Sequence, residues 1–162
     1  MKGRYSLQSL RQIRKQALEE RSLEVARAST RVATAKETLA TRRGLARRER
    51  EQQAQILARE QQRLTRGAAC ANDLHEVSAW QVAARLQLQE LEVRVNEAEA
   101  ELRRAEEARS RAREALAIAE AEKSAVDKHH EHWQTEEAAL REANADEEGQ
   151  EIWGSRQLEV RG

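Results

Sequence analysis

Between Leu74 and Leu140, a mostly apolar position recurs at alternating steps of three and four residues. This spacing is the heptad pattern of a helix whose a and d residues form one seam, and its mean period of about 3.5 residues indicates a left-handed supercoil with a partner helix. The segment therefore needs a second helix. Its seam consists of Leu74, Val77, Gln81, Ala84, Leu88, Leu91, Val95, Ala98, Leu102, Ala105, Arg109, Ala112, Leu116, Ala119, Lys123, Val126, His130, Trp133, Glu137 and Leu140.

The second helix lies upstream in the same chain, and residues 67–73 separate the two patterns. Gly67 suits a helix C-cap, and Asn72 or Asp73 suits an N-cap, with Glu76 placed to close a capping box on Asp73. We therefore predict that the chain turns here. The upstream seam consists of Leu7, Leu10, Leu18, Val25, Ala28, Val32, Ala35, Leu39, Ala46 and Ile56.

These patterns predict an all-α fold, a long two-helix antiparallel coiled-coil hairpin that forms a single elongated domain over residues 1–162. A turn centred near Cys70 would place Val32 near Arg109. The second helix would outrun the first and leave its last part without a partner in the chain. The expected bounds are about 5–66 for helix 1, 67–73 for the turn, about 73–148 for helix 2, and 149–162 for a C-terminal tail that acts as a short anchor.

Composition and charge support the hairpin. Proline and phenylalanine are absent and 36% of the residues are charged, a mixture typical of long helices. Such a charge content also fits intrinsic disorder, but the sustained heptads favour helices. Residues 1–66 hold 17 basic and 7 acidic side chains, and residues 67–162 hold 12 and 22. Because oppositely charged halves favour pairing with each other, we expect a monomer.

Neither an apolar run of about 20 residues, the length that spans a bilayer, nor a signal-peptide pattern is evident in the sequence. We therefore expect a cytoplasmic protein without membrane insertion. The single cysteine, Cys70, agrees with a reducing compartment because it cannot form an intramolecular disulfide.

Motifs for chemistry are weak. The sequence has no Gly-rich phosphate loop, no Gly-x-Ser-x-Gly and no Cys-x-x-Cys, so we expect neither an enzyme nor a bound cofactor. His129, His130 and His132 cluster, but no further ligand is in reach, so we expect no metal site. The basic residues of the first helix are interleaved with glutamate, and the lone Tyr5 offers no stacking platform, which argues against nucleic-acid binding.

Trp80 is the residue that the seam explains least. It lies one position away from the seam, beside a second apolar set, Ala79, Val82, Ala83 and Leu86. Apolar residues all round a helix indicate a further partner, so these five residues form a candidate docking surface at the tip. The alternative is a local shift of phase that turns Trp80 inward to close the end of the hairpin.

Several segments together resemble the stalk proteins of type III secretion, which are flagellar FliJ and the YscO-type (SctO-like) proteins of injectisomes. The resemblance extends over essentially the whole chain, and the acidic tail leans towards the injectisome branch. The segments are Trp80-Gln81 after the turn, Leu88 and Leu91, the run His129-His130-Glu131-His132-Trp133-Gln134, and Ile152-Trp153.

The resemblance implies a fold like the coiled coil of the rotary ATP synthase gamma subunit and a site at the inner-membrane secretion apparatus. It implies that the tip meets the cytoplasmic domain of the export gate, and that the terminal end enters and stimulates a hexameric export ATPase. Escort of secretion chaperones is a further implication, and the alternative is a generic coiled-coil spacer or scaffold. The terminal-end residues are Leu7, Leu10, Arg11, Arg14, Trp133, Leu140 and Trp153.

Overall fold

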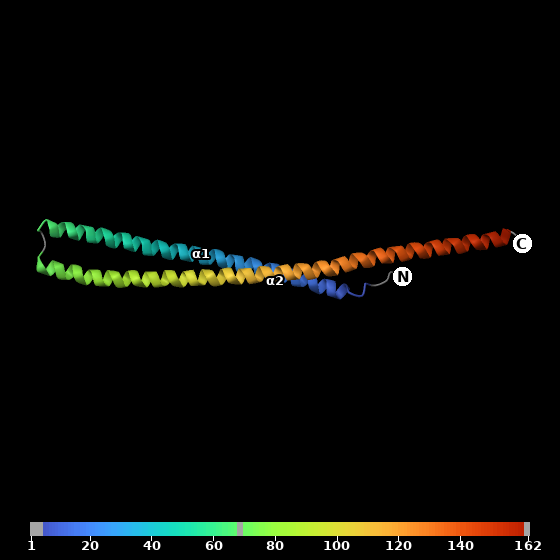
Figure 1. Cartoon of the computed structure of the whole chain (residues 1–162), viewed down its shortest axis with the longest axis horizontal. Coiled ribbons are helices and arrows are strands. Elements are labelled where there is room, and N and C mark those ends of the chain that lie inside the picture. Colours follow the sequence, from blue (N-terminus) through green and yellow to red (C-terminus); the bar gives the residue numbers. More distant parts are fainter. Residues whose placement is uncertain (1–4, 68–69, 161–162) are drawn as a thin grey trace. The chain divides into compact units, whose positions relative to one another are not determined.

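The computed structural model describes residues 5–67 and 70–160, with the backbone alone for residues 149–160. Two helices make up nearly all of this chain, α1 over Gln8–Thr65 and α2 over Ala71–Val160 (Figure 1). The described residues contain no strand, and the two helices pack against each other. The predicted all-α helical hairpin is confirmed.

The paired helices fall into two compact units. The turn unit, as we call it here, is Glu24–Ala112, and the terminal unit is Met1–Leu23 together with Arg113–Gly162. Within each unit, a segment of α1 runs antiparallel to a segment of α2. Both helices therefore contribute to both units.

The end of α1 follows the predicted cap. The helix ends at Thr65, and Gly67 has a φ of 69°, the left-handed conformation that favours glycine. The backbone N–H of Gly67 donates to the carbonyl oxygen of Leu64 at 3.1 Å. A side chain at Gly67 would meet nothing within 4 Å, so the conformation alone calls for glycine there.

The start of α2 differs from the prediction. The helix begins at Ala71, so Cys70 takes the N-cap position that was assigned to Asn72 or Asp73. The backbone N–H of Cys70 donates to Oδ2 of Asp73 at 2.9 Å, which is one half of a capping box. Glu76 instead accepts a hydrogen bond from Nδ2 of Asn72 at 3.2 Å. The prediction erred because an acidic residue can serve either as the cap or three residues after it.

The end of α2 also differs. The sequence predicts a tail from residue 149, whereas the backbone stays helical to Val160. No proline interrupts this stretch, and its two glycines, Gly149 and Gly154, each cost only about 1 kcal/mol relative to alanine, which a long helix absorbs. The segment is thus a continuation of α2 and not a separate tail.

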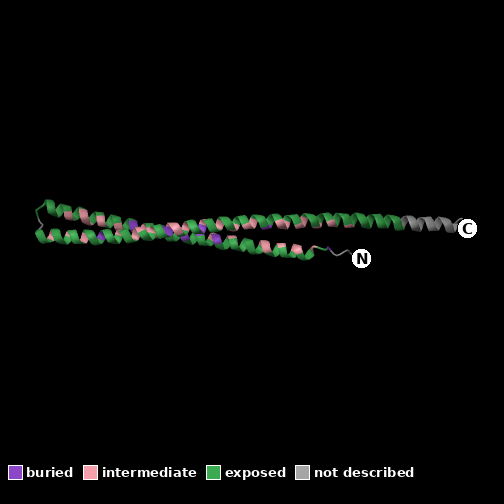
Figure 2. Ribbon diagram, turned by 60° about the horizontal axis from the view of Figure 1, so that its bottom comes forward, coloured by how far each residue is buried: buried purple, intermediate pink, exposed green. Residues whose placement is uncertain are grey.

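The core lies along the predicted seams and is thin (Figure 2). Val32 is only 2% exposed and packs in one cluster with Ala35, Ala105 and Leu102. Arg109, the residue expected near Val32, lies one helical turn beyond Ala105 on α2. The buried apolar residues that the structure describes are Tyr5, Ala28, Val32, Ala35, Leu39, Ala46, Ala84, Ala98, Ala105 and Ala119.

The ends of the α2 seam are not covered. Leu74 is 52% exposed and Leu140 is 63% exposed, while the seam positions between Ala84 and Glu137 are buried or partly buried. Gln81, also on the predicted seam, is exposed. The seam therefore begins to pack properly only after the first turns of α2.

Ion pairs join the helices inside each unit, and those described here have arginine on α1 and a carboxylate on α2. In the turn unit, Arg43 lies 2.7 Å from Glu99, and Arg50 lies 2.6 Å from Glu92. The predicted attraction between the basic and acidic halves appears here as specific contacts. Each exposed pair contributes only about 0.2–1 kcal/mol to the free energy of unfolding. The pairs therefore affect which helices pair more than how stable the pairing is.

In the terminal unit, Asp127 accepts hydrogen bonds from two cations. Nζ of Lys123 lies 2.6 Å from Oδ2, and Nε of Arg11 lies 2.8 Å from Oδ1. The Lys123 hydrogen bond, followed by that of Arg11, lowers the pKa of Asp127 below its ordinary value of 3.8. A second pair, Arg14 with Glu122, lies nearby on the same two helices.

The first prediction concerns the core. Val32→Ala should lower the free energy of unfolding by about 1.5 kcal/mol, because it removes two buried carbon groups at roughly 0.8 kcal/mol each. Val93→Ala is the matched control, since Val93 is 50% exposed. Urea unfolding followed by circular dichroism measures both variants. Equal losses in the two variants would show that Val32 is not a core residue.

The second prediction concerns acid. The folded-state pKa of Asp127 lies below its unfolded value, so its stabilisation is present above that unfolded value and is lost as the pH falls through the folded pKa. Asp127→Asn should therefore lower the melting temperature near neutral pH and should reduce the further loss between pH values of about 5 and 3.

Thermal melts by circular dichroism measure this difference. Asp146→Asn is the control, because the exposed Asp146 forms no ion pair among the described residues. If Asp127→Asn loses as much stability in acid as the parent protein, the ion pairs of Asp127 do not contribute.

Candidate functional site

Trp80 lies on the side of α2 that faces α1. It is partly buried and lines a shallow hollow of about 200 Å³ together with Val77 of α2 and with Ile56, Glu60 and Arg63 of α1. Because residues of both helices line this hollow, Trp80 belongs to the contact between them. The structure thus separates Trp80 from the other residues of the candidate tip surface.

The rest of the tip surface faces away from α1. Ala79, Val82, Ala83 and Leu86 are all exposed, Val82 at 58% and Leu86 at 59%. They lie on one face of the helix at spacings of three, four and seven residues. Large aliphatic side chains lined up in solvent are what a partner-binding face requires.

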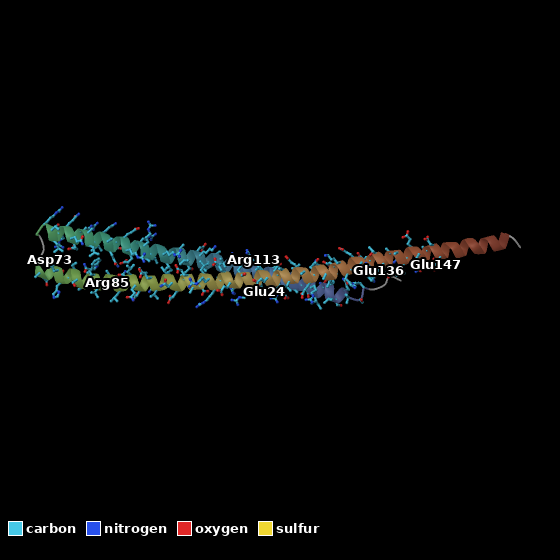
Figure 3. All side chains as sticks on the ribbon, viewed as in Figure 1. Glu24, Asp73, Arg85, Arg113, Glu136 and Glu147 are labelled. Atoms are coloured by element: carbon cyan, nitrogen blue, oxygen red, sulfur yellow. The ribbon has the colours of Figure 1, made fainter. Side chains whose placement is uncertain are left out.

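Asp73 lies in the first turn of α2, ahead of this surface in the chain (Figure 3). The hydrogen bond from the backbone N–H of Cys70, aided by the Cys70 side chain and by Arg63 at 3.9 Å, lowers the pKa of Asp73. The carboxylate therefore stays charged at neutral pH and holds the first turn of α2.

At the terminal end, Tyr5 closes the pairing of the two helices. Tyr5 is 6% exposed, and its hydroxyl lies 2.9 Å from Nδ1 of His129. Its ring meets His130 edge-on, with centroids 4.7 Å apart, and lies 5.3 Å from the ring of Trp133. Tyr5 precedes α1 and has no place in the heptads, so the heptad pattern does not predict it as a core residue.

The predicted terminal-end residues divide into three groups. Leu7, Leu10 and Trp133 are partly buried within the unit. Arg11 and Arg14 are engaged with carboxylates of α2, as described above. Leu140 is 63% exposed, and the side chain of Trp153 lies outside the described residues. Leu140 is therefore the accessible apolar residue of this set.

Beyond Trp133, α2 continues without contact from α1. Residues 134–148 are exposed apart from Glu137, and they carry six carboxylates and one arginine. Arg141 pairs with Glu137 on the same helix, and Figure 3 marks Glu136 and Glu147 along this stretch. This stretch of α2 is therefore an acidic helix that is exposed nearly all round.

The described residues also bear on metal binding and on membrane spanning. In the ranges that the structure covers, no group of three or more potential metal ligands comes together. Within the same residues, no helix is both long and apolar enough to cross a membrane. His129 contacts Tyr5, and His132 lies 3.2 Å from Glu136 on the same helix.

Comparison with known proteins identifies the family. The model of the YscO-like proteins matches residues 2–158, which include both helical seams and the turn. No curated protein and no solved structure matches the chain. Because the match covers nearly the whole chain, this protein belongs to the YscO-like family of type III secretion stalk proteins.

Proposed function

We propose that this protein is the non-enzymatic central stalk of a type III export apparatus. Its terminal end enters the pore of the hexameric export ATPase and stimulates it, and its tip links the ATPase to the cytoplasmic domain of the export gate. The observation that supports this most is the family match over a helical hairpin whose second helix extends past its partner. The injectisome branch is favoured by the acidic composition of the last part of α2.

The terminal end supports the ATPase contact. A central pore accommodates a narrow helical element, and α2 after Trp133 is a helix that α1 does not cover. Leu140 supplies exposed apolar surface there, and the neighbouring carboxylates supply charge that a basic pore lining would complement. Tyr5 and Trp133 hold the two helices together just before this segment.

The tip supports the gate contact. Val82 and Leu86 expose aliphatic surface within the first turns of α2, close to the turn that Gly67 and Asp73 stabilise. Such a surface contributes binding energy only when a partner removes it from water. We place the protein in the cytoplasm, peripheral to the inner-membrane apparatus, and extend the proposal to secretion chaperones without assigning residues to them.

The third prediction tests the terminal end. Leu140→Ser should weaken the stimulation of ATP hydrolysis by a purified hexameric export ATPase, raising the concentration for half-maximal stimulation about fivefold, because roughly 1 kcal/mol of apolar burial is lost. Removal of residues 149–162 should weaken it further. Ile118→Ser is the matched control, since Ile118 is 61% exposed on the same helix.

Circular dichroism should show nearly unchanged helicity in all three proteins. Full stimulation by both the Leu140 variant and the truncated protein would remove the terminal end from the mechanism. Lack of any association between the parent protein and the ATPase would instead favour the generic coiled-coil scaffold.

The fourth prediction tests the tip. Val82→Ala with Leu86→Ala should weaken binding to the cytoplasmic domain of the export gate about tenfold, because exposed aliphatic contacts at an interface centre are lost. The melting temperature should stay near that of the parent, since both residues are exposed. Trp80→Ala should instead lower the melting temperature, because Trp80 lies between the helices.

Calorimetric titration with the gate domain measures the affinities. If the Val82 and Leu86 variant binds the gate as the parent does, while Trp80→Ala binds weakly without loss of stability, Trp80 is the docking residue and the exposed stripe is not.

A further inference from the structure

The outward side of α2 in the turn unit carries a second heptad line, which we call the outer face. Ala79, Leu86 and Val93 are seven residues apart, and Val82 and Gln89 follow the first two at a spacing of three. Val82, Leu86 and Val93 are each at least 50% exposed. A helix with one heptad seam buries it against one neighbour, so a second seam on the opposite side indicates a second helical neighbour.

The surface of the outer face is uneven, so side chains of a second helix can fit into it. Leu86, Gln89, Glu90, Val93 and Arg94 line a shallow hollow of about 450 Å³. In a coiled coil, a side chain of one helix inserts into a hole formed by four residues of the facing helix. A polar residue such as Gln89 at a single core position lowers affinity and specifies the register.

Charge distinguishes the two flanks of the outer face. Glu92 and Glu99, on one flank, are neutralised by Arg50 and Arg43 of α1. On the other flank, Glu90 and Glu97 are exposed, and neither has an ion-pair partner among the residues that the structure describes. A ligand helix would therefore meet a net negative charge along this edge only.

Arg94 removes this charge only in part, because one guanidinium stands against two carboxylates. It lies between the two glutamates in sequence but forms no ion pair with either in the described part of the chain, and its position on the helix is farther from the apolar line. The carboxylates of Glu90 and Glu97 are the charges nearest the line on that flank.

From these observations we propose that the outer face binds an amphipathic helix of a partner protein. The partner helix carries aliphatic residues at its a and d positions and lysine or arginine opposite Glu90 and Glu97. The inference rests on the proposed function in part, because the first turns of the outer face belong to the tip surface assigned to the gate; it specifies a helix as the element that binds. An antiparallel second copy is disfavoured, since it would set these glutamates against each other.

The test uses the full chain and two designed helical peptides of about four heptads, long enough to form helix in water. Both carry leucine and valine at a and d; one has lysine and the other glutamate on the flank facing Glu90 and Glu97. In fluorescence anisotropy, the parent should bind the lysine peptide about tenfold more tightly than the glutamate peptide. Glu90→Lys with Glu97→Lys should reverse this preference.

A second variant tests the apolar line. Val82→Ser, Leu86→Ser and Val93→Ser together should abolish binding of the lysine peptide while the circular dichroism spectrum stays helical, because all three residues are exposed. Ile118→Ser, which changes an equally exposed aliphatic residue in the terminal unit, should bind as the parent does.

Four results would overturn the inference, and the fourth leaves the proposed function standing. The first is an unchanged peptide preference after the double lysine substitution, and the second is full binding by the triple serine variant. The third is a concentration-dependent dimer that sedimentation detects in the parent but not in the triple variant, which would make a second copy the occupant. Gate binding that depends on Leu86 without peptide binding would retain the proposed function and reject the helix as its partner element.

Discussion

The close contact of two helices along a line of alanines is the constraint on which this structure depends. Seven of the ten buried apolar residues that the structure describes are alanine, and Val32 and Leu39 supply most of the remaining volume in the turn unit. Alanine lets helices approach closely, but each one buries little surface, so the seam provides modest stability per turn. The pairing therefore depends on additional contacts at its edges, which are the arginine–carboxylate pairs and the Tyr5 cluster.

Those edge contacts also determine which helix pairs with which. The interhelical ion pairs described above have their cation on α1 and their carboxylate on α2, from Arg11 with Asp127 to Arg50 with Glu92. A pairing of α1 with another copy of α1 would set arginine against arginine. Because exposed ion pairs are individually weak, this pattern acts through specificity, and it favours pairing within one chain over self-association.

Because the seam between the helices is thin, several apolar side chains are not buried in it. Val82, Leu86 and Val93 in the turn unit, and Leu140 in the terminal unit, contribute nothing to the helix pairing and stay in water. A chain under selection for stability alone would have little reason to keep such residues at regular spacing on outward faces. Their regular spacing on exposed faces is the observation from which the partner-binding surfaces are proposed.

The sequence by itself determined the two helices, their seams, the turn region and the family, because heptad spacing and glycine at a helix end are local signals. Only the tertiary structure decided which side Trp80 faces, that Tyr5 packs on Trp133, and that Cys70 and not Asp73 takes the N-cap position. These features depend on how the short turn sets the register of the two helices. A shift of a few residues there changes which distant side chains meet, while the repeat along each helix stays the same.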